Sequence, residues 1–174
     1  DGGNHRVLVF DVAAITNGEN AVNVLGQANF TSNGFATTQS GLSNPGGFAY
    51  DSVNSRLFVA DSGNHRVMVF DLAVIVDGEN AVNVLGQADF TSNSAGTTQS
   101  VLSFPSYAVY QSSTGRLFTV DANNNRVMVF DVAAITNGEA AVNVLGQANF
   151  TDAGTAITAG RFDPPRGITM NGND

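Results

Sequence analysis

The sequence has no cysteine and no lysine, and it carries little charge of any kind. Without cysteine, neither disulfide bonds nor thiolate chemistry is available to the chain. Only 13% of the 174 residues are charged, and 15 acidic residues stand against seven arginines, which gives a net charge of −8. Nucleic-acid binding depends on clustered cations that neutralise phosphates, so this balance argues against a nucleic-acid partner.

Long apolar runs are lacking too, since no uninterrupted stretch approaches the ~20 residues of a membrane span. No basic-then-apolar leader begins the sequence, although one could have been removed from a longer precursor. Hydrophobic residues nevertheless make up 43% of the chain, which is too many for a disordered protein. We therefore expect a folded domain of ordinary size with a sizeable core and no membrane span.

The sequence repeats with a period of 60 residues, so that adding 60 to a residue number gives its counterpart without a gap. Phe10, Phe70 and Phe130 correspond in this way. We expect one structural unit over 1–174, with repeats at 1–60, 61–120 and 121–174, the last of which lacks its final six residues. Copies this similar should form near-identical units that bury their apolar faces on their neighbours.

Each period predicts four strands separated by turns rich in Gly, Asn, Asp and Ser. In the best-defined copy the expected strands are 46–51, 56–60, 65–70 and 81–86. In the connection that follows residue 70, Asp71 is expected to cap a short helical turn that ends near Gly78.

Both faces of the third strand are apolar, because Val67 and Val69 point one way while Met68 and Phe70 point the other. A strand of this kind lies between two packed layers. The fourth strand includes Asn83 among its apolar residues, as an outer, partly solvated strand would. Four short strands at a fixed period predict an all-β fold built from β-propeller blades of four antiparallel strands. A solenoid of parallel strands is the main alternative.

The stretch NPGGFAYDSVNSRLFVADSGNHRVMVFD at 44–71 resembles the NHL repeat, with its Pro-x-Gly, its strand ending in Asp and its ADxxNHRV turn. The match continues at 104–131, and the segments 1–11 and 163–171 carry parts of it. The resemblance implies a β-propeller, commonly six-bladed. It implies no single activity, because such folds include binding modules and a few enzymes.

Counting strands, the chain begins with the third and fourth strands of one blade, continues with two complete blades and ends with a first strand at 166–171. Three blades cannot close a ring, so the chain is expected to be half of a six-bladed propeller. Either two copies meet about a two-fold axis, or the chain is a stretch of a longer propeller, which the missing second strand favours. In both cases open edges predict self-association, with 5–10 of a second copy completing the blade that contains 166–171.

The repeated Asp-x-x-Asn-His-Arg turn invites a catalytic or metal-binding interpretation, but copies spread around a ring are too far apart to share a metal. The histidines, His5 and His65, are replaced by Asn125 in the third copy. A structural role is favoured, in which aspartate and arginine pair and hold neighbouring blades together. The predicted pairs are Asp1 with Arg6, Asp61 with Arg66, and Asp121 with Arg126.

Two other patterns are expected to be structural. Asn-x-Thr, the acceptor pattern for N-glycosylation, occurs at Asn29 and Asn149, but Asp89 breaks it in the middle copy, which favours a turn residue. The acidic turn at 51–55 has oxygen ligands suited to calcium but lacks the EF-hand arrangement. We expect no bound metal and no cofactor.

A ligand site, if present, is expected at the rim where the second-to-third turns and the long interblade loops meet. The three copies differ most there. The candidate ligand-binding residues are Ser106, Tyr107, Arg166 and Phe35.

The sequence therefore predicts a non-enzymatic NHL-type propeller that binds a ligand or builds an assembly, completed by self-association, with a homodimer as the expected partner arrangement. The alternative is a fragment of a six-bladed, metal-dependent lyase or lactonase whose ligands come from missing blades. The acidic, cysteine-free composition rich in Asn, Thr, Ser and Gly suits an extracellular or cell-surface protein of a prokaryote.

Overall fold

The computed structural model describes residues 1–171, which form ten strands and three short 3-10 helical turns. The strands are β1 (Val7–Val9), β2 (Asn23–Leu25), β3 (Pro45–Asp51), β4 (Arg56–Asp61), β5 (Arg66–Asp71), β6 (Asn83–Leu85), β7 (Pro105–Gln111), β8 (Arg116–Asp121), β9 (Arg126–Asp131) and β10 (Asn143–Leu145). The turns are η1 (Gly2–Asn4), η2 (Ser62–Asn64) and η3 (Ala122–Asn124). Within this part of the chain, no helix has the length and apolar character needed to cross a membrane.

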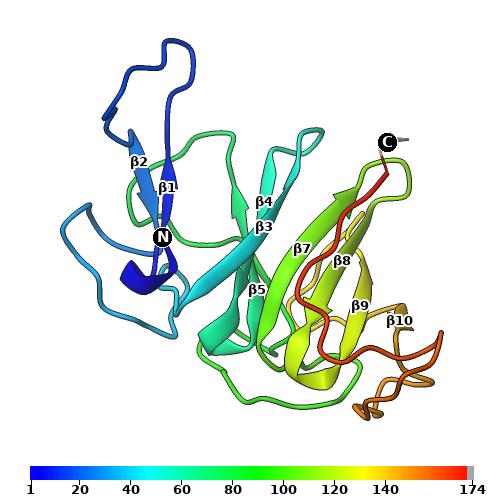
Figure 1. The fold of residues 1–174 in the computed structure, drawn as a ribbon. Coiled ribbons are helices and arrows are strands. Elements are labelled where there is room, and N and C mark those ends of the chain that lie inside the picture. The colour runs from blue at the N-terminus through cyan, green and yellow to red at the C-terminus, as the bar shows by residue number, and fades with distance from the viewer. Residues whose placement is uncertain (172–174) are drawn as a thin grey trace.

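The strands form three separate sheets that stand side by side (Figure 1). β1 pairs with β2, and two complete sheets follow in the orders β3-β4-β5-β6 and β7-β8-β9-β10. Every pairing between these strands is antiparallel. The prediction of an all-β fold with four-stranded antiparallel blades is confirmed, and the parallel-stranded solenoid is wrong.

Each of the four strands differs from its expected bounds by one or two residues at one or both ends, and two of these differences follow from positive backbone angles. The third strand begins at Arg66 rather than residue 65, because His65 has a φ of 54° and closes the turn η2. The fourth strand ends at Leu85 rather than residue 86, because Gly86 has a φ of 81°, and it begins at Asn83 rather than residue 81. The left-handed region is incompatible with the extended conformation of a strand.

The sheet that contains β5 is buried on both faces, against the third sheet on one side and the first sheet on the other. Val67 and Val69 of β5 pack in a core shared with the third sheet, which includes Leu117. Met68 and Phe70 face the other way, into a core that they share with the first sheet. The two-sided burial read from the alternation is therefore confirmed, and each such side chain contributes about 1.5–3 kcal/mol when fully buried.

The predicted helical turn after β5 is wrong. The Oδ1 of Asp71 accepts the N–H of Ala73 at 2.9 Å, a local turn that competes with a helix cap. The connection then closes through a second turn, in which the Glu79 carboxylate accepts the N–H of Val76 at 3.1 Å. The helical conformation instead occurs before β5, as the single 3-10 turn η2.

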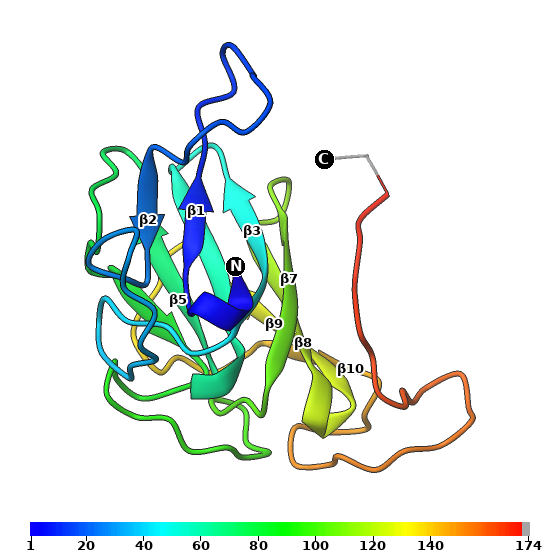
Figure 2. The same cartoon turned by 60° about the vertical axis from the view of Figure 1, so that its left-hand side comes forward.

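The predicted last strand at 166–171 is also wrong, since this segment runs extended beside β7 without joining a sheet (Figure 2). The equivalent strands β3 and β7 pair with β4 and β8, and no described residue pairs in this way with 166–171. The residue that precedes the proline at the start of this segment also differs from its counterparts before β3 and β7. The residues before Pro45 and Pro105 have φ values of 50° and 57°, whereas their counterpart is Pro164, whose ring fixes φ near −65°.

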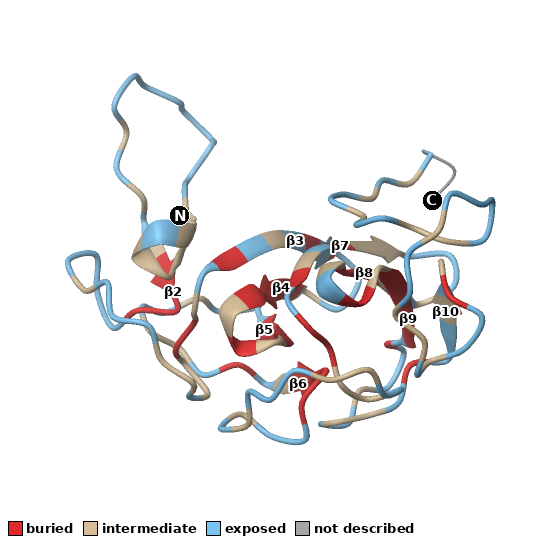
Figure 3. Ribbon diagram, turned by 60° about the horizontal axis from the view of Figure 1, so that its bottom comes forward, coloured by how far each residue is buried: buried red, intermediate tan, exposed pale blue. Residues whose placement is uncertain are grey.

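The sheets do not close into a ring, so the first and last of them have no neighbouring sheet on one side among the described residues. Figure 3 shows buried residues gathered in the two complete sheets, while the loop between β1 and β2 projects from the molecule and is exposed. The fold is consistent with consecutive propeller blades that leave two open ends.

Candidate functional site

Asp61, Asn64 and Arg66 form a buried polar network at the turn between β4 and β5. The Nε of Arg66 and the Nδ2 of Asn64 both donate to the Oδ2 of Asp61, at 2.7 and 2.8 Å. The other oxygen, Oδ1, accepts the backbone N–H of Ser43 at 2.6 Å. Burial raises the pKa of Asp61, and the Arg66 guanidinium acts in the opposite direction. Asp121, Asn124 and Arg126 repeat this arrangement in the next sheet.

The same guanidinium connects the two loops on either side of the blade. Its Nη2 donates to the carbonyls of Thr38 and Gly41, at 3.0 and 2.9 Å, in the loop that enters the blade. Its Nη1 donates to the carbonyl of Phe90 in the loop that leaves it. Arg66 is fully buried, and so is the carboxylate with which it pairs. The arrangement therefore holds neighbouring blades in register, and each buried charge has hydrogen-bond partners.

The first copy of this network is incomplete. Arg6 pairs with Asp1 at 2.7 Å and donates to the carbonyl of Phe30. In the part of the chain that the structure describes, no preceding loop supplies carbonyls to its Nη2. Its side chain is 17% exposed and that of Asp1 is 28% exposed, whereas both members of the other two pairs are fully buried.

The two histidines occupy hydrogen-bonding positions between blades. The Nδ1 of His5 accepts the N–H of Asn44 at 2.9 Å, and the Nδ1 of His65 accepts the N–H of Phe104 at the same distance. In the third copy the corresponding pair is Asn125 and Pro164, and proline has no N–H to donate. Histidine is thus present at the two junctions that offer a donor and absent from the third.

Two of the four predicted ligand-binding residues, Ser106 and Arg166, line the same hollow, which has a volume of about 300 Å³. Phe104, Asn123 and the prolines at 164 and 165 complete much of its wall. The Oγ of Ser106 is buried and has no hydrogen-bond partner among the described residues. A cationic group beside an apolar wall suits a small ligand with a carboxylate and an apolar portion.

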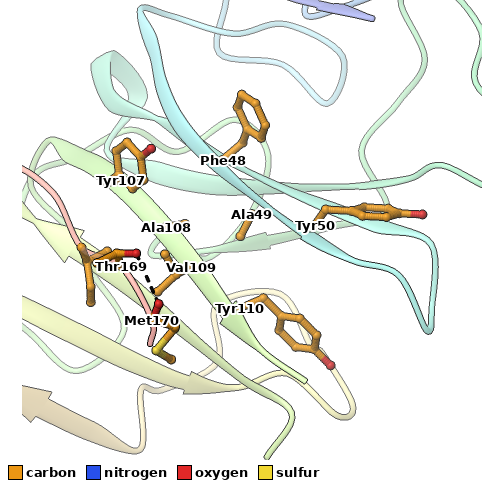
Figure 4. Close-up of a pocket in the computed structure, with 10 residues that line it drawn as sticks. Phe48, Ala49, Tyr50, Tyr107, Ala108, Val109, Tyr110, Thr169 and Met170 are labelled. Atoms are coloured by element: carbon orange, nitrogen blue, oxygen red, sulfur yellow. Dashed lines mark hydrogen bonds between the residues drawn. The ribbon is translucent and has the colours of Figure 1, made fainter. Parts of the chain in front are cut away.

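Tyr107 lines a second, larger hollow of about 470 Å³ between β3, β7 and the C-terminal segment. Figure 4 shows Phe48, Tyr50 and Tyr110 on the two strands, with Met170 on the facing segment. The Tyr107 ring packs on bare backbone, since a Cβ built on Gly47 would lie 2.4 Å from the Cδ2 of that ring. Glycine at 47 therefore lets the two innermost strands approach closely.

Phe35 lies apart from these residues, on the loop that enters the first complete blade. Its ring packs edge to face on His5, with the ring centroids 5.9 Å apart, and its side chain is 74% exposed. The structure thus brings Ser106 together with Arg166, places Tyr107 in the neighbouring hollow and leaves Phe35 against a histidine.

Comparison with known families gives one match, in which residues 42–70 fit the NHL repeat. This segment runs from the end of an interblade loop through β3, β4, η2 and β5, and it contains the Asp61–Arg66 network. The chain contains an NHL repeat. No curated protein matches the sequence at a significant level.

Around the NHL repeat, the other polar patterns lie in turns. The Oδ1 of Asn29 accepts the backbone N–H and the hydroxyl of Thr31 at 3.0 and 2.8 Å, and Asp89 makes the same two bonds to Thr91. The turn requires only a side-chain oxygen that accepts hydrogen bonds at this position. Asn and Asp both supply one, which explains why Asp89 stands where the other repeats have Asn.

The acidic turn of the NHL repeat is occupied by local bonds. The carboxylate of Asp51 accepts N–H groups from Val53, Asn54 and Arg56, so its oxygens are engaged with the protein itself. Across residues 1–171, no three histidine or acidic side chains come close enough together to hold a metal ion.

Two features were missed at the sequence level. The histidine bond has a signal in the sequence, since the replacement of histidine at 125 coincides with a proline 39 residues later. The aromatic hollow has a signal as well, because Phe48, Tyr50 and Tyr110 alternate along first strands and two of them are more than half exposed.

Proposed function

We propose that this chain is a non-enzymatic NHL-type β-propeller module that builds an assembly, with a second copy completing its ring of blades. The observation that carries the proposal is the unequal burial of equivalent outer strands. Leu25 and Leu85 are fully buried by a following blade, whereas Leu145 at the open end is 46% exposed. At the internal junctions the face of this strand is covered by the next blade, whereas β10 has no next blade among the described residues. An exposed apolar strand face of this kind favours association with another molecule.

The proposal that the module is non-enzymatic is supported by the hydrogen bonds and ion pairs that the histidines and aspartates of the repeated turn make within the protein. The histidine Nδ1 atoms accept backbone N–H groups between blades, and the buried aspartates pair with arginines. These side chains are committed to holding the blades. A stoichiometric amount of zinc or calcium that stays with the purified protein through dialysis would instead favour the propeller-enzyme alternative.

The assembly is tested by measuring mass in solution over a concentration series, by sedimentation equilibrium or light scattering. The expected result is a species with twice the 18.0 kDa mass of one chain, which dissociates on dilution. A mass of one chain at every concentration would contradict the proposal. An extracellular or cell-surface setting is part of the proposal and is supported only by composition.

A ligand-binding role is a second candidate, favoured by the hollow shared by Ser106 and Arg166. The probe is glutarate, which offers carboxylates for the guanidinium and methylene groups for the prolines. We expect saturable shifts of the backbone amide signals of Phe104, Ser106 and Tyr107 in NMR spectra, which Arg166→Ala abolishes and Arg116→Ala retains. Shifts that are absent, or that are equal in the two variants, would contradict this role.

A further inference from the structure

The connection between the third and fourth strands of each blade docks on the outer strand of the blade before it. After β5, the Oδ1 of Asp77 accepts the N–H of Val24 on β2 at 3.0 Å. The next residue returns a bond, since the N–H of Gly78 donates to the carbonyl of Val24 at 3.0 Å. Asn23 on β2 adds a bond from its Nδ2 to the carbonyl of Ile75 at 3.4 Å.

The next junction repeats this docking with the same atoms. The Oδ1 of Asn137 accepts the N–H of Val84 on β6 at 3.1 Å, and the N–H of Gly138 donates to the carbonyl of Val84 at 3.2 Å. Asparagine and aspartate thus do the same work, because both present an acceptor oxygen. One docking geometry therefore occurs twice within the chain.

The first connection, residues 11–22, has the sequence for this docking, but no strand among residues 1–171 lies beneath it. Its residues 11–19 are identical to 131–139, which dock on β6. Ile15 is 75% exposed. Nothing lies within 4 Å of a Cβ built on Gly18, whereas one built on Gly78 or Gly138 would lie 2.9 or 3.0 Å from the Cα of Ala28 or Ala88, in the segment that follows the outer strand. This loop projects freely at the top of Figure 1.

The last outer strand has the opposite deficiency. Residues 141–147, which contain β10, are identical to 81–87, which contain β6. The last two residues of β6 are buried beneath the docked loop, whereas no residue of β10 is buried. The two open sides of the described sheets therefore present a loop and a strand that match each other.

Arg6 shows a second deficiency at the same end as the free loop. The Nη2 of Arg66 and that of Arg126 each donate to two carbonyls of the loop that enters their blade. Adding the repeat period shows that the corresponding carbonyls for Arg6 are those of Thr158 and Arg161 in the last loop. Within one chain, these residues belong to the opposite open end.

We propose that the loop 11–22 of one copy docks on β10 of a second copy, in the register of the two internal junctions. Asn17 Oδ1 accepts the N–H of Val144 of the second copy, and the Gly18 N–H donates to the carbonyl of Val144. Arg6 donates to the carbonyls of Thr158 and Arg161. This inference rests on the proposed assembly and names its contacts, and two such junctions related by a two-fold axis complete the pair.

This junction is weaker than the internal ones. Gln39 and Gln99 exchange bonds with the backbone of Ala81 and Ala141 across the internal junctions. Their counterpart in the last loop is Ala159, which has no side-chain amide to donate. Association between copies is therefore reversible, whereas the internal junctions stay intact.

The test uses the absence of cysteine, which allows single thiols to be placed without background. Asn17→Cys and Asn143→Cys chains are mixed and treated with a short bismaleimide, since the side chains at the equivalent internal positions 137 and 83 lie 3.3 Å apart. Asn83→Cys with Asn137→Cys in one chain is the positive control, and Asn33→Cys mixed with Asn143→Cys is the negative one. We expect the 17–143 link to form at least about 10-fold faster than the negative control, because docking raises the effective concentration to the millimolar range even though Asn17→Cys removes the Asn17 acceptor.

Two further variants distinguish a wrong docking register from a wrong assembly. Asn17→Ala should weaken self-association about tenfold through the lost acceptor, whereas Asn17→Asp should retain it, because Asp77 fills this role internally. If dimers form but the 17–143 link is no faster than the control, or the two Asn17 variants behave alike, the docking register is wrong while the assembly stands. If no dimer forms at any concentration, both are wrong.

Discussion

Replacing Arg66 by alanine tests the physical role given to the repeated turn. The substitution leaves the buried carboxylate of Asp61 without its ion-pair partner and the carbonyls of Thr38 and Gly41 without their donor. Removing one member of a fully buried ion pair costs about 3–5 kcal/mol, because the remaining charge stays buried without compensation. Arg6→Ala is the matched control, since its ion pair is partly exposed and is expected to contribute only about 1 kcal/mol.

The assay is urea unfolding at neutral pH, followed by circular dichroism at one low protein concentration. With a slope of about 2 kcal/mol per molar urea, Arg66→Ala should lower the midpoint by about 1.5–2.5 M and Arg6→Ala by about 0.5 M. Equal shifts for the two variants would refute the reasoning, because burial and loop contacts would then make no difference to the value of the pair.

Three smaller predictions concern other polar contacts. His65→Ala should cost about 1 kcal/mol in chemical unfolding, because the Phe104 N–H loses its acceptor; Asn125→His should gain nothing, since Pro164 has no N–H, and a gain would contradict the assignment. Asn29→Asp should leave the melting temperature unchanged in calorimetry, whereas Asn29→Ala should lower it by roughly 2–4 °C, because only the alanine variant lacks the acceptor used in the turn. Burial tends to raise the pKa of Asp51, but hydrogen bonds from Asn54 and Arg56 outweigh it and hold that pKa below its ordinary 3.8. The unfolded chain therefore binds a proton at Asp51 more readily than the folded chain does, so the stability that this carboxylate provides is present above the ordinary pKa and is lost as pH falls through the folded pKa. When urea unfolding is measured at a series of pH values down to about 2, Asp51→Gln should lose less stability than the unaltered protein. An equal loss in the two proteins would count against the assignment.

Alternation along the strands was sufficient to predict the two-sided burial, because a side-chain period of two fixes which residues share a face. Val67 and Met68 fall in the two different cores for this reason. The antiparallel strands of the two complete blades were therefore predictable from the sequence pattern of each repeat.

The helical turn after Asp71 and the strand at 166–171 were predicted wrongly for reasons that the alternation of apolar residues does not reveal. Asp71 was read as a helix cap, but its carboxylate accepts the N–H two residues later and closes an Asx turn instead. The segment 166–171 has the residues of a first strand but lacks a paired neighbour, and backbone pairing rather than propensity creates a strand.

The junctions were only partly predictable. The pairing of aspartate with arginine could be expected from their repeated spacing, whereas the three backbone carbonyls around Arg66 could not, because they come from loops 24 to 28 residues away. The docking of Asp77 and Asn137 was missed for the same reason, since its partners lie on another blade. At the rim, sequence divergence marked Ser106 and Arg166, which share a hollow, but it also marked Phe35, which does not line that hollow.

The claim that one junction serves both within the chain and between copies is tested most directly by amide hydrogen exchange, resolved by residue. At concentrations where the chain associates, the amides of Gly18 and Val144 should be protected, although less strongly than those of Gly78 and Val84, which are hydrogen-bonded at the internal junctions. On dilution, protection should disappear at 18 and 144 and persist at 78 and 84. Exchange at 18 and 144 that is as fast as in an open loop at every concentration would contradict the claim.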